Sequence, residues 1–147
     1  MNMSKKEYAR YVKDKEPHSP HLKNFIKAFL IGGAICVLGQ SFIALFMRLG
    51  ISKEDSGTLA SLCLILLSTL LTGFGLYDKI AKHAGAGTLV PITGFANSIV
   101  SESIEFKSEG YILGVGAKMF TLAGPVIVYG VSASVIYGII YWLTTLF

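Results

Sequence analysis

The chain has 147 residues, of which 52% are hydrophobic and only 15% charged, and it carries a formal net charge of +4. A soluble domain has about 25% charged residues, so this composition excludes an ordinary water-soluble enzyme. The high apolar content also excludes an intrinsically disordered chain.

Positive charge gathers at the N-terminal end. Seven of the 13 basic residues lie within residues 1–27, directly before an apolar run. Basic residues in this position favour the cytoplasmic side of a membrane, and they are not arranged as a patch on a soluble fold, so we expect no nucleic-acid partner. We therefore predict a basic cytoplasmic tail over 1–27 and a single membrane domain over 28–147, in contact with the lipid bilayer.

Two uncharged runs predict the first two membrane-spanning helices. Residues 28–47 form a run of 20, which as a helix reaches about 30 Å, the hydrocarbon thickness of a bilayer. Ser19 followed by Pro20 predicts that this helix begins earlier. The second run covers 56–77, with a capped start at Asp55 and Ser56, and its helix can continue into the charged residues that follow.

A third uncharged run, 125–147, predicts the last span. Pro125 stands at its start, where a missing N–H group costs nothing. Tyr137, Tyr141 and Trp142 cluster toward its far end and suggest an aromatic belt at the membrane interface.

The segment 84–124, between the second and third spans, has a different character. It holds seven of the 16 glycines together with Pro91. We predict a discontinuous or re-entrant segment, with Pro91 opening one helical piece and Gly124 and Pro125 closing another. The predicted fold is therefore an all-α integral membrane protein with three full spans and a broken Gly/Pro-rich segment before the last. Broken backbone at membrane depth lines a cavity or is buried in protein, whereas the alternative is that the glycines only let helices pack closely.

Charged and small residues supply further candidates. Glu102, Glu105 and Glu109 lie at i, i+3 and i+7, hence on one helical face, and predict either a cation vestibule or a solvated loop. Small residues recur every four positions on the last span and predict a helix-packing face for self-association or for a membrane partner. These residues are Gly130, Ser134 and Gly138.

No catalytic set, nucleotide-binding signature or metal-ligand spacing is present in the sequence. We expect no enzyme activity, no cofactor and no metal site.

Two blocks carry a resemblance to a known family. AGAGTLVPITGFANSIVSESIEFKSEG (84–110) and GAKMFTLAGPVIVYG (116–130) resemble the SpoVAC/SpoVAE family of sporulation membrane proteins, and HLKNFIKAFLIGGAICVLGQ (21–40) resembles the first span of that family. The resemblance covers nearly the whole chain and is stronger to the AC type than to the AE type.

The resemblance implies a role in the SpoVA system of endospore-forming bacteria. That role is a channel component that moves dipicolinic acid, with calcium, across the inner spore membrane in sporulation and germination. The implied partners are other SpoVA membrane subunits of the SpoVAE type and the soluble dipicolinate-binding protein SpoVAD. A non-conducting scaffold that assembles these proteins is the alternative.

A dianionic cargo requires positive charge and polar groups along its path. We therefore expect the broken segment to supply the path, with Lys118 at or near it. Lys118 could instead extend to the headgroups, because a lysine near an interface does so readily. The candidate path residues are Lys118, Asn97, Thr93, Pro91, Gly94 and Gly124.

Overall fold

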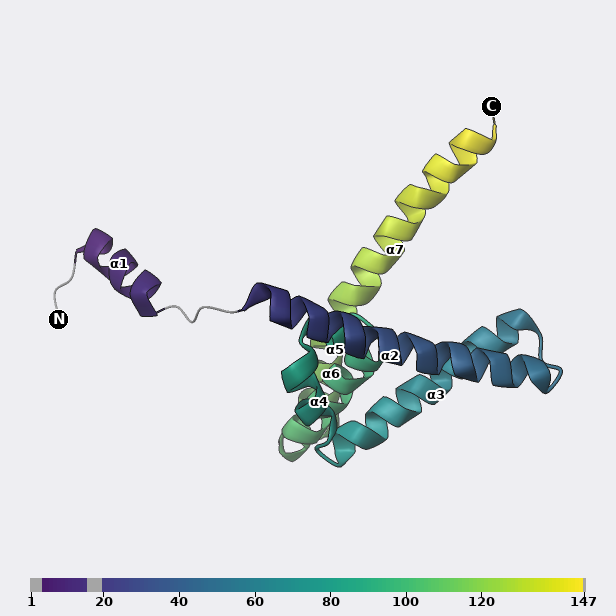
Figure 1. The fold of residues 1–147 in the computed structure, drawn as a ribbon, viewed down its shortest axis with the longest axis horizontal. Helices are drawn as coiled ribbons and strands as arrows, with labels where there is room; N and C mark the ends of the chain where they lie inside the picture. The colour runs from purple at the N-terminus through teal and green to yellow at the C-terminus, as the bar shows by residue number, and fades with distance from the viewer. Residues whose placement is uncertain (1–3, 16–19, 147) are drawn as a thin grey trace.

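The computed structural model describes residues 4–15 and 20–146, and every regular element among them is a helix. This confirms the predicted all-α class (Figure 1). The elements in chain order are α1 (Lys5–Lys15), α2 (His21–Arg48), α3 (Lys53–Gly73), α4 (Tyr77–Ala84), α5 (Ala86–Leu89), α6 (Ile92–Glu105), the 3₁₀ helix η1 (Phe106–Glu109), the π-helix η2 (Tyr111–Gly116) and α7 (Ala117–Thr145).

Helix α1 forms in the basic tail, and a reciprocal pair of hydrogen bonds caps its N-terminus. The main-chain N–H of Ser4 donates to a carboxylate oxygen of Glu7 at 2.9 Å, and the N–H of Glu7 donates to the Ser4 hydroxyl at 3.4 Å. This reciprocal pair is a capping box. The hydrogen bonds from the N–H and then the hydroxyl of Ser4 hold the pKa of Glu7 below its usual value.

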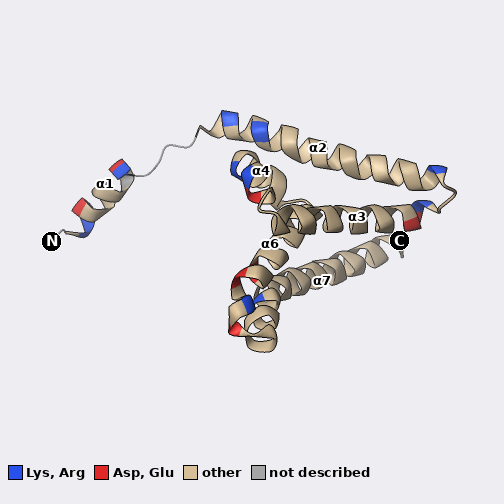
Figure 2. Ribbon diagram, turned by 90° about the horizontal axis from the view of Figure 1, so that it is seen from below, with Lys and Arg blue, Asp and Glu red and all other residues tan. Residues whose placement is uncertain are grey.

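Three helical stretches are long and apolar enough to cross a membrane, as the sequence predicts: His21–Arg48, Lys53–Gly73 and Tyr111–Thr145. The charged residues lie toward the ends of α2 and α3 and leave the middle of both helices uncharged (Figure 2). Helix α2 begins at His21 with Pro20 as its N-cap, seven residues before its uncharged run, and Ser19 lies outside the described residues.

Helices α2 and α3 form a hairpin (Figure 1). Gly50 turns the chain with a φ of +86°, and the Ser52 hydroxyl accepts a hydrogen bond from the N–H of Asp55 at 3.1 Å. The cap of α3 is therefore Ser52 rather than the predicted Asp55 and Ser56, because helix α3 already begins at Lys53. Ser56 is instead fully buried within the first turns.

The second spanning helix ends at Gly73 and does not continue into the charged residues that follow. Gly75 has a φ of +65°, a left-handed conformation that only glycine adopts readily, so it ends the helical course. Helix α4 then starts separately at Tyr77.

A break before the last span is present as a series of short helices, α4, α5, α6, η1 and η2, but it covers 77–116 rather than the predicted 84–124. Pro91 opens α6 as its N-cap, with extended backbone, as predicted. Thr93 bonds to Ser68, and Asn97 bonds to Thr72. The two partners are 25 residues apart in each pair, so moving along α3 from Ser68 to Thr72 corresponds to moving along α6 from Thr93 to Asn97. Helix α6 therefore runs in the same direction as α3 and beside its second half.

Helix α7 corrects the predicted start of the last span. It begins at Ala117 rather than Pro125, and Pro125 lies inside it, so Gly124 and Pro125 do not close a helical piece. Inside a helix, a proline ring clashes with the carbonyl of the residue four positions earlier and with the Cβ and N–H of the preceding residue. Gly124 has no Cβ, which removes part of that clash and lets the helix continue. Beyond Pro125, α7 projects away from the other helices (Figure 1).

Candidate functional site

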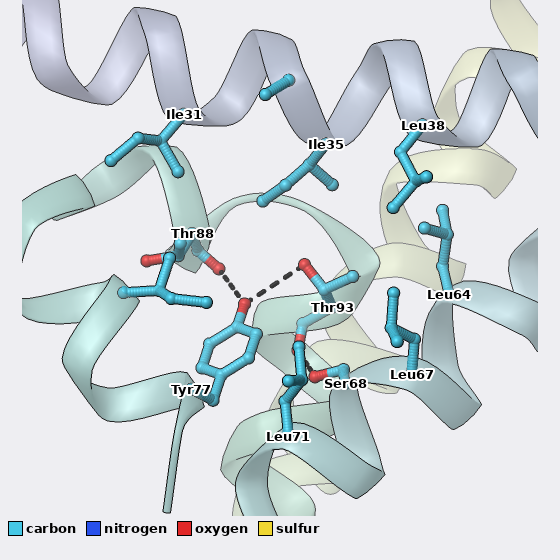
Figure 3. A pocket seen from close by; sticks show the side chains of 12 residues that line it. Ile31, Ile35, Leu38, Leu64, Leu67, Ser68, Leu71, Tyr77, Thr88 and Thr93 are labelled. Carbon is cyan, nitrogen blue, oxygen red and sulfur yellow. Dashed lines mark hydrogen bonds between the residues drawn. The ribbon is translucent and has the colours of Figure 1, made fainter.

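A network of buried hydroxyl groups joins α3, α4, the end of α5 and α6 (Figure 3). The Tyr77 hydroxyl donates to the main-chain oxygen of Thr88 at 3.0 Å and lies 3.1 Å from the Thr93 hydroxyl. The Ser68 hydroxyl donates to the main-chain oxygen of Thr93 at 2.6 Å. Tyr77 has a single hydroxyl proton, so when it donates to Thr88 the Thr93 hydroxyl supplies the proton of the second bond.

These four side chains are almost entirely shielded from solvent. Their exposed fractions are 0% for Ser68, 2% for Thr88, 4% for Tyr77 and 5% for Thr93. A buried hydroxyl is costly unless it is hydrogen-bonded, and each of these side chains is paired. The network therefore fixes the broken segment against α3.

The network forms one wall of a pocket of about 230 Å³ between α2 and α3 (Figure 3). Isoleucine, leucine and alanine side chains from α2 and α3 make up most of the lining. Its surface is almost entirely apolar because the hydroxyls are engaged in hydrogen bonds, mostly to main-chain oxygens. Such a pocket suits an apolar group and would disfavour a free dianion. The lining residues are Ile31, Ala34, Ile35, Leu38, Leu64, Leu67, Ser68, Leu71, Tyr77, Ile80, Thr88 and Thr93.

A second polar contact extends the junction between α3 and α6. The Thr72 hydroxyl lies 2.8 Å from the side-chain oxygen of Asn97 and 2.7 Å from the main-chain oxygen of Ser68. The polar face of the second span is thus used inside the chain, where Thr93 and Asn97 lie one helical turn apart on α6.

Backbone contacts without intervening side chains hold the turn around Pro91. A Cβ atom on Gly87 would lie 2.3 Å from the main-chain oxygen of Ala28 in α2, and one on Gly94 would lie 2.2 Å from that of Thr88. Real Cβ atoms do not approach so closely. Gly87 and Gly94 are therefore required by packing: α5 lies directly on α2, and the start of α6 lies directly on α5.

Lys118 lies elsewhere. Its ammonium group is 4.1 Å from the centre of the Phe106 ring, a cation–π contact at the junction of α6 with α7. From Thr93 to the end of α6 at Glu105 the helix rises about 18 Å, at 1.5 Å per residue. Among the candidate path residues, Thr93, Asn97, Gly94 and Pro91 therefore gather around the start of α6, while Lys118 is held at its far end. Gly124 lies further along α7.

The three glutamates do not share one uninterrupted helical face. Glu102 and Glu105 belong to the last turn of α6, but the α-helix ends at Glu105, and Glu109 lies in the 3₁₀ turn η1. The prediction that Glu102, Glu105 and Glu109 share one helical face is therefore wrong for Glu109. Among residues 4–15 and 20–146, no group of three His, Cys, Asp or Glu side chains is placed to hold a metal ion.

The face of Gly130, Ser134 and Gly138 is open. Gly130 and Gly138 have no atom from outside their own helix within 4 Å of the place that a Cβ atom would take, and Ser134 donates its hydroxyl proton to the main-chain oxygen of Gly130 at 2.8 Å. The residues from Pro125 to Leu146 are exposed. This part of the chain is therefore available to lipid or to another protein.

Sequence reasoning missed Tyr77 and Thr88 as members of the junction. Tyr77 reads as the last residue of an uncharged run, and Thr88 as part of a glycine-rich stretch. One signal was available for Tyr77: a hydroxyl-bearing aromatic residue between an apolar run and a charged residue generally needs a hydrogen-bond partner when buried.

The comparisons with known proteins agree with this architecture. A family model described as SpoVAC/SpoVAEB sporulation membrane protein matches residues 24–140. A relative from Bacillus subtilis (strain 168), stage V sporulation protein AC, is 48% identical over 141 residues, which cover 95% of this chain and 94% of the relative. No solved structure matches the chain.

Proposed function

Because the chain belongs to the SpoVAC/SpoVAEB family of sporulation membrane proteins, we propose that it is a channel component that moves dipicolinic acid, with calcium, across the inner spore membrane. The basic tail lies on the cytoplasmic side in this proposal. Other SpoVA membrane subunits and the soluble dipicolinate-binding protein SpoVAD are the proposed partners. In this proposal the chain acts in the uptake of dipicolinic acid during sporulation and in its release during germination.

The observation that carries the proposal is the interrupted segment packed between the first two spans. The turn at Pro91 lies beside Ser68, five residues before α3 ends at Gly73, which is about 7.5 Å inside that helix. A chain that enters beside a spanning helix, turns and leaves again is typical of permeation and substrate sites in membrane proteins. We propose that residues 77–105 form such a re-entrant element.

The proposed path lies between chains rather than through one. The pocket between α2 and α3 is apolar, and a desolvated dianion is strongly disfavoured there. The open part of α7 offers a surface on which further chains can close a path. A complete pore would then need several copies or the other SpoVA subunits.

The decisive experiment is a flux assay with the purified full-length chain in liposomes. Vesicles loaded with calcium dipicolinate are followed by terbium luminescence outside, and a co-trapped neutral sugar reports unspecific leakage. Release of dipicolinate without release of the sugar supports the channel. Release of both, or of neither even when the partner subunits are added, contradicts it.

A non-conducting scaffold is the second candidate, and the exposed last helix favours it. Gly130 and Gly138 have open space around them, so close approach of a partner helix needs no rearrangement. A scaffold would retain the SpoVAE-type subunits and SpoVAD on co-purification, yet add nothing to the flux that those proteins produce without it.

A further inference from the structure

A second pocket lies at the charged end of the molecule, between the start of α2 and the turn from α4 into α5. Its volume is about 420 Å³. Unlike the pocket between α2 and α3, it is partly polar, because Lys82, His83 and the amide of Asn24 line it beside apolar residues. The remaining lining residues are Phe25, Ala28, Ala84, Gly85 and Ala86.

The surroundings of this pocket are strongly basic. The start of α2 and helix α4 carry four lysines, Lys23, Lys27, Lys79 and Lys82, against a single acid, Asp78. Figure 2 shows the basic residues of α4 close to those at the start of α2. Asp78 lies one turn before Lys82 and offsets one charge, so four positive charges less one leave +3 without counting histidine.

The C-terminal end of α4 borders the pocket, and its carbonyl oxygens would repel an anion unless they are hydrogen-bonded. The Nδ1 of His83 lies 2.9 Å from the main-chain oxygen of Lys79, and the N–H of Gly85 donates to that of Ala81 at 2.9 Å. Of the last four carbonyl oxygens of α4, that of Ala81 is therefore engaged, which reduces its repulsion of a negative group. The bond to Lys79 also fixes the His83 ring with Nδ1 as the donor, since a carbonyl can only accept.

The inner end of the pocket is rigid and lies at the membrane boundary. The contact of Gly87 with the backbone of Ala28 fixes α5 against α2 at the pocket's inner edge. Lys27 is the last charged residue before the uncharged run of α2, so the pocket lies at the level of the lipid headgroups. Phe25 borders the pocket, and Phe29, one turn deeper, is 71% exposed.

We propose that this pocket binds the phosphate group of an anionic phospholipid, with its acyl chains along Phe25 and Phe29. Lys82 donates to the phosphate oxygens, as does Nε2 of His83 when the ring carries its second proton, and the amide of Asn24 donates a hydrogen bond to the headgroup. A basic pocket between membrane helices, continued by an apolar surface at the hydrocarbon level, has the shape and charge of a lipid headgroup site. A soluble dianion would satisfy the charge but leave the apolar surface without a partner.

The test uses native mass spectrometry of the purified full-length chain in detergent with an equal mixture of phosphatidylglycerol and phosphatidylcholine. The wild-type chain is expected to retain phosphatidylglycerol preferentially. The double variant Lys82→Ala, His83→Ala is expected to lower the ratio of retained phosphatidylglycerol to retained phosphatidylcholine. Loss of the lysine alone accounts for a decrease of roughly fivefold. Both side chains are exposed, so folding is preserved, and helix content by circular dichroism checks this.

The matched control is Arg48→Ala with Lys53→Ala, which removes basic residues at the opposite end of α2 and α3. Its lipid ratio should equal that of the wild type. An unchanged ratio in the Lys82 and His83 variant, or an equal loss in the control, overturns the proposal. Displacement of phosphatidylglycerol by millimolar inorganic phosphate or dipicolinate would assign the pocket to a soluble anion and also overturn it.

Discussion

The Tyr77 hydroxyl lies 3.0 Å from the main-chain oxygen of Thr88, so the first residue of α4 is bonded to the turn that precedes α6. The same hydroxyl lies 3.1 Å from that of Thr93. One side chain thus holds both sides of the turn around Pro91, which makes it the most informative single position in the broken segment.

Tyr77→Phe should destabilise the fold by about 1–3 kcal/mol, because it leaves the buried oxygen of Thr88 without this donor. The measurement is the free energy of unfolding of the detergent-solubilised chain. Tyr129→Phe is the control, since Tyr129 is 77% exposed and should be replaceable without loss. Equal stability of the two variants would mean that the Tyr77 hydroxyl contributes nothing to the stability of the fold.

Gly87→Ala should destabilise the chain by about 1–3 kcal/mol, because the added methyl group meets backbone rather than a flexible side chain. The contact would be with the carbonyl of Ala28, at 2.3 Å. Gly33→Ala adds the same methyl group on α2 with nothing within 4 Å and should be neutral or slightly stabilising. Melting temperatures of both variants decide, and a stable Gly87→Ala chain would exclude direct contact of α5 with α2.

Gly130→Leu and Gly138→Leu should reduce assembly without destabilising the single chain. Nothing outside the helix lies within 4 Å of either position, while a partner helix needs a small face for close approach. The readout is cross-linking and co-purification with SpoVA subunits. Ser132→Leu makes a similar change on the opposite side of α7 and should leave assembly intact. Unchanged partner recovery in all three variants would assign the glycine face to lipid.

Lys118→Glu should lower dipicolinate flux in liposomes, because it places a negative charge where the proposed path has a positive one. A unit charge at about 4 Å contributes about 4 kcal/mol at an effective dielectric of 20, so even a tenth of this is measurable. Lys118→Gln removes the charge without reversing it. Lys53→Glu is the control, because it makes the same charge reversal at the first residue of α3. Wild-type flux in both Lys118 variants would remove this side chain from the path.

Phe106→Leu tests whether the cation–π contact positions Lys118. The ammonium group lies 4.1 Å from the ring centre, and such contacts contribute about 0.5–1 kcal/mol at exposed sites. If the contact holds the charge at the path, Phe106→Leu should alter flux in the wild-type chain and have no effect in Lys118→Gln. An equal effect in both backgrounds would show that the ring acts independently of the lysine.

The spanning helices could be predicted because uncharged runs of 20 to 23 residues leave little choice of structure. The interruption could be predicted as well, since Pro91 and the neighbouring glycines disfavour a continuous helix. The end of α3 was harder to locate: Gly75 takes a positive φ, whereas Gly73, two residues earlier, is still helical. Composition does not distinguish the two.

Two other features could not be predicted from the sequence: the continuation of α7 through Pro125, and the hydroxyl network. Whether a proline starts a helix or lies within one depends on the residues before it, and here the helix had already begun at Ala117. Tyr77, Thr88 and Thr93 are brought together by the turn at Gly85 and by contact with α2, which are tertiary features without a local pattern. The permeation role of the candidate path residues stays a prediction.

The course of the three helices that are long enough to span a membrane places two kinds of surface toward opposite ends. Helix α2 leaves the lysine-rich end, α3 returns to it, and α7 leaves it again (Figure 2). The aromatic residues at the end of α7, including the stacked pair Tyr137 and Tyr141, therefore lie on the opposite side from the lysines of α4. A water-soluble protein can reach one of these ends but not both from a single compartment. In the proposed membrane orientation, partners from the two compartments would therefore bind at opposite ends without competing.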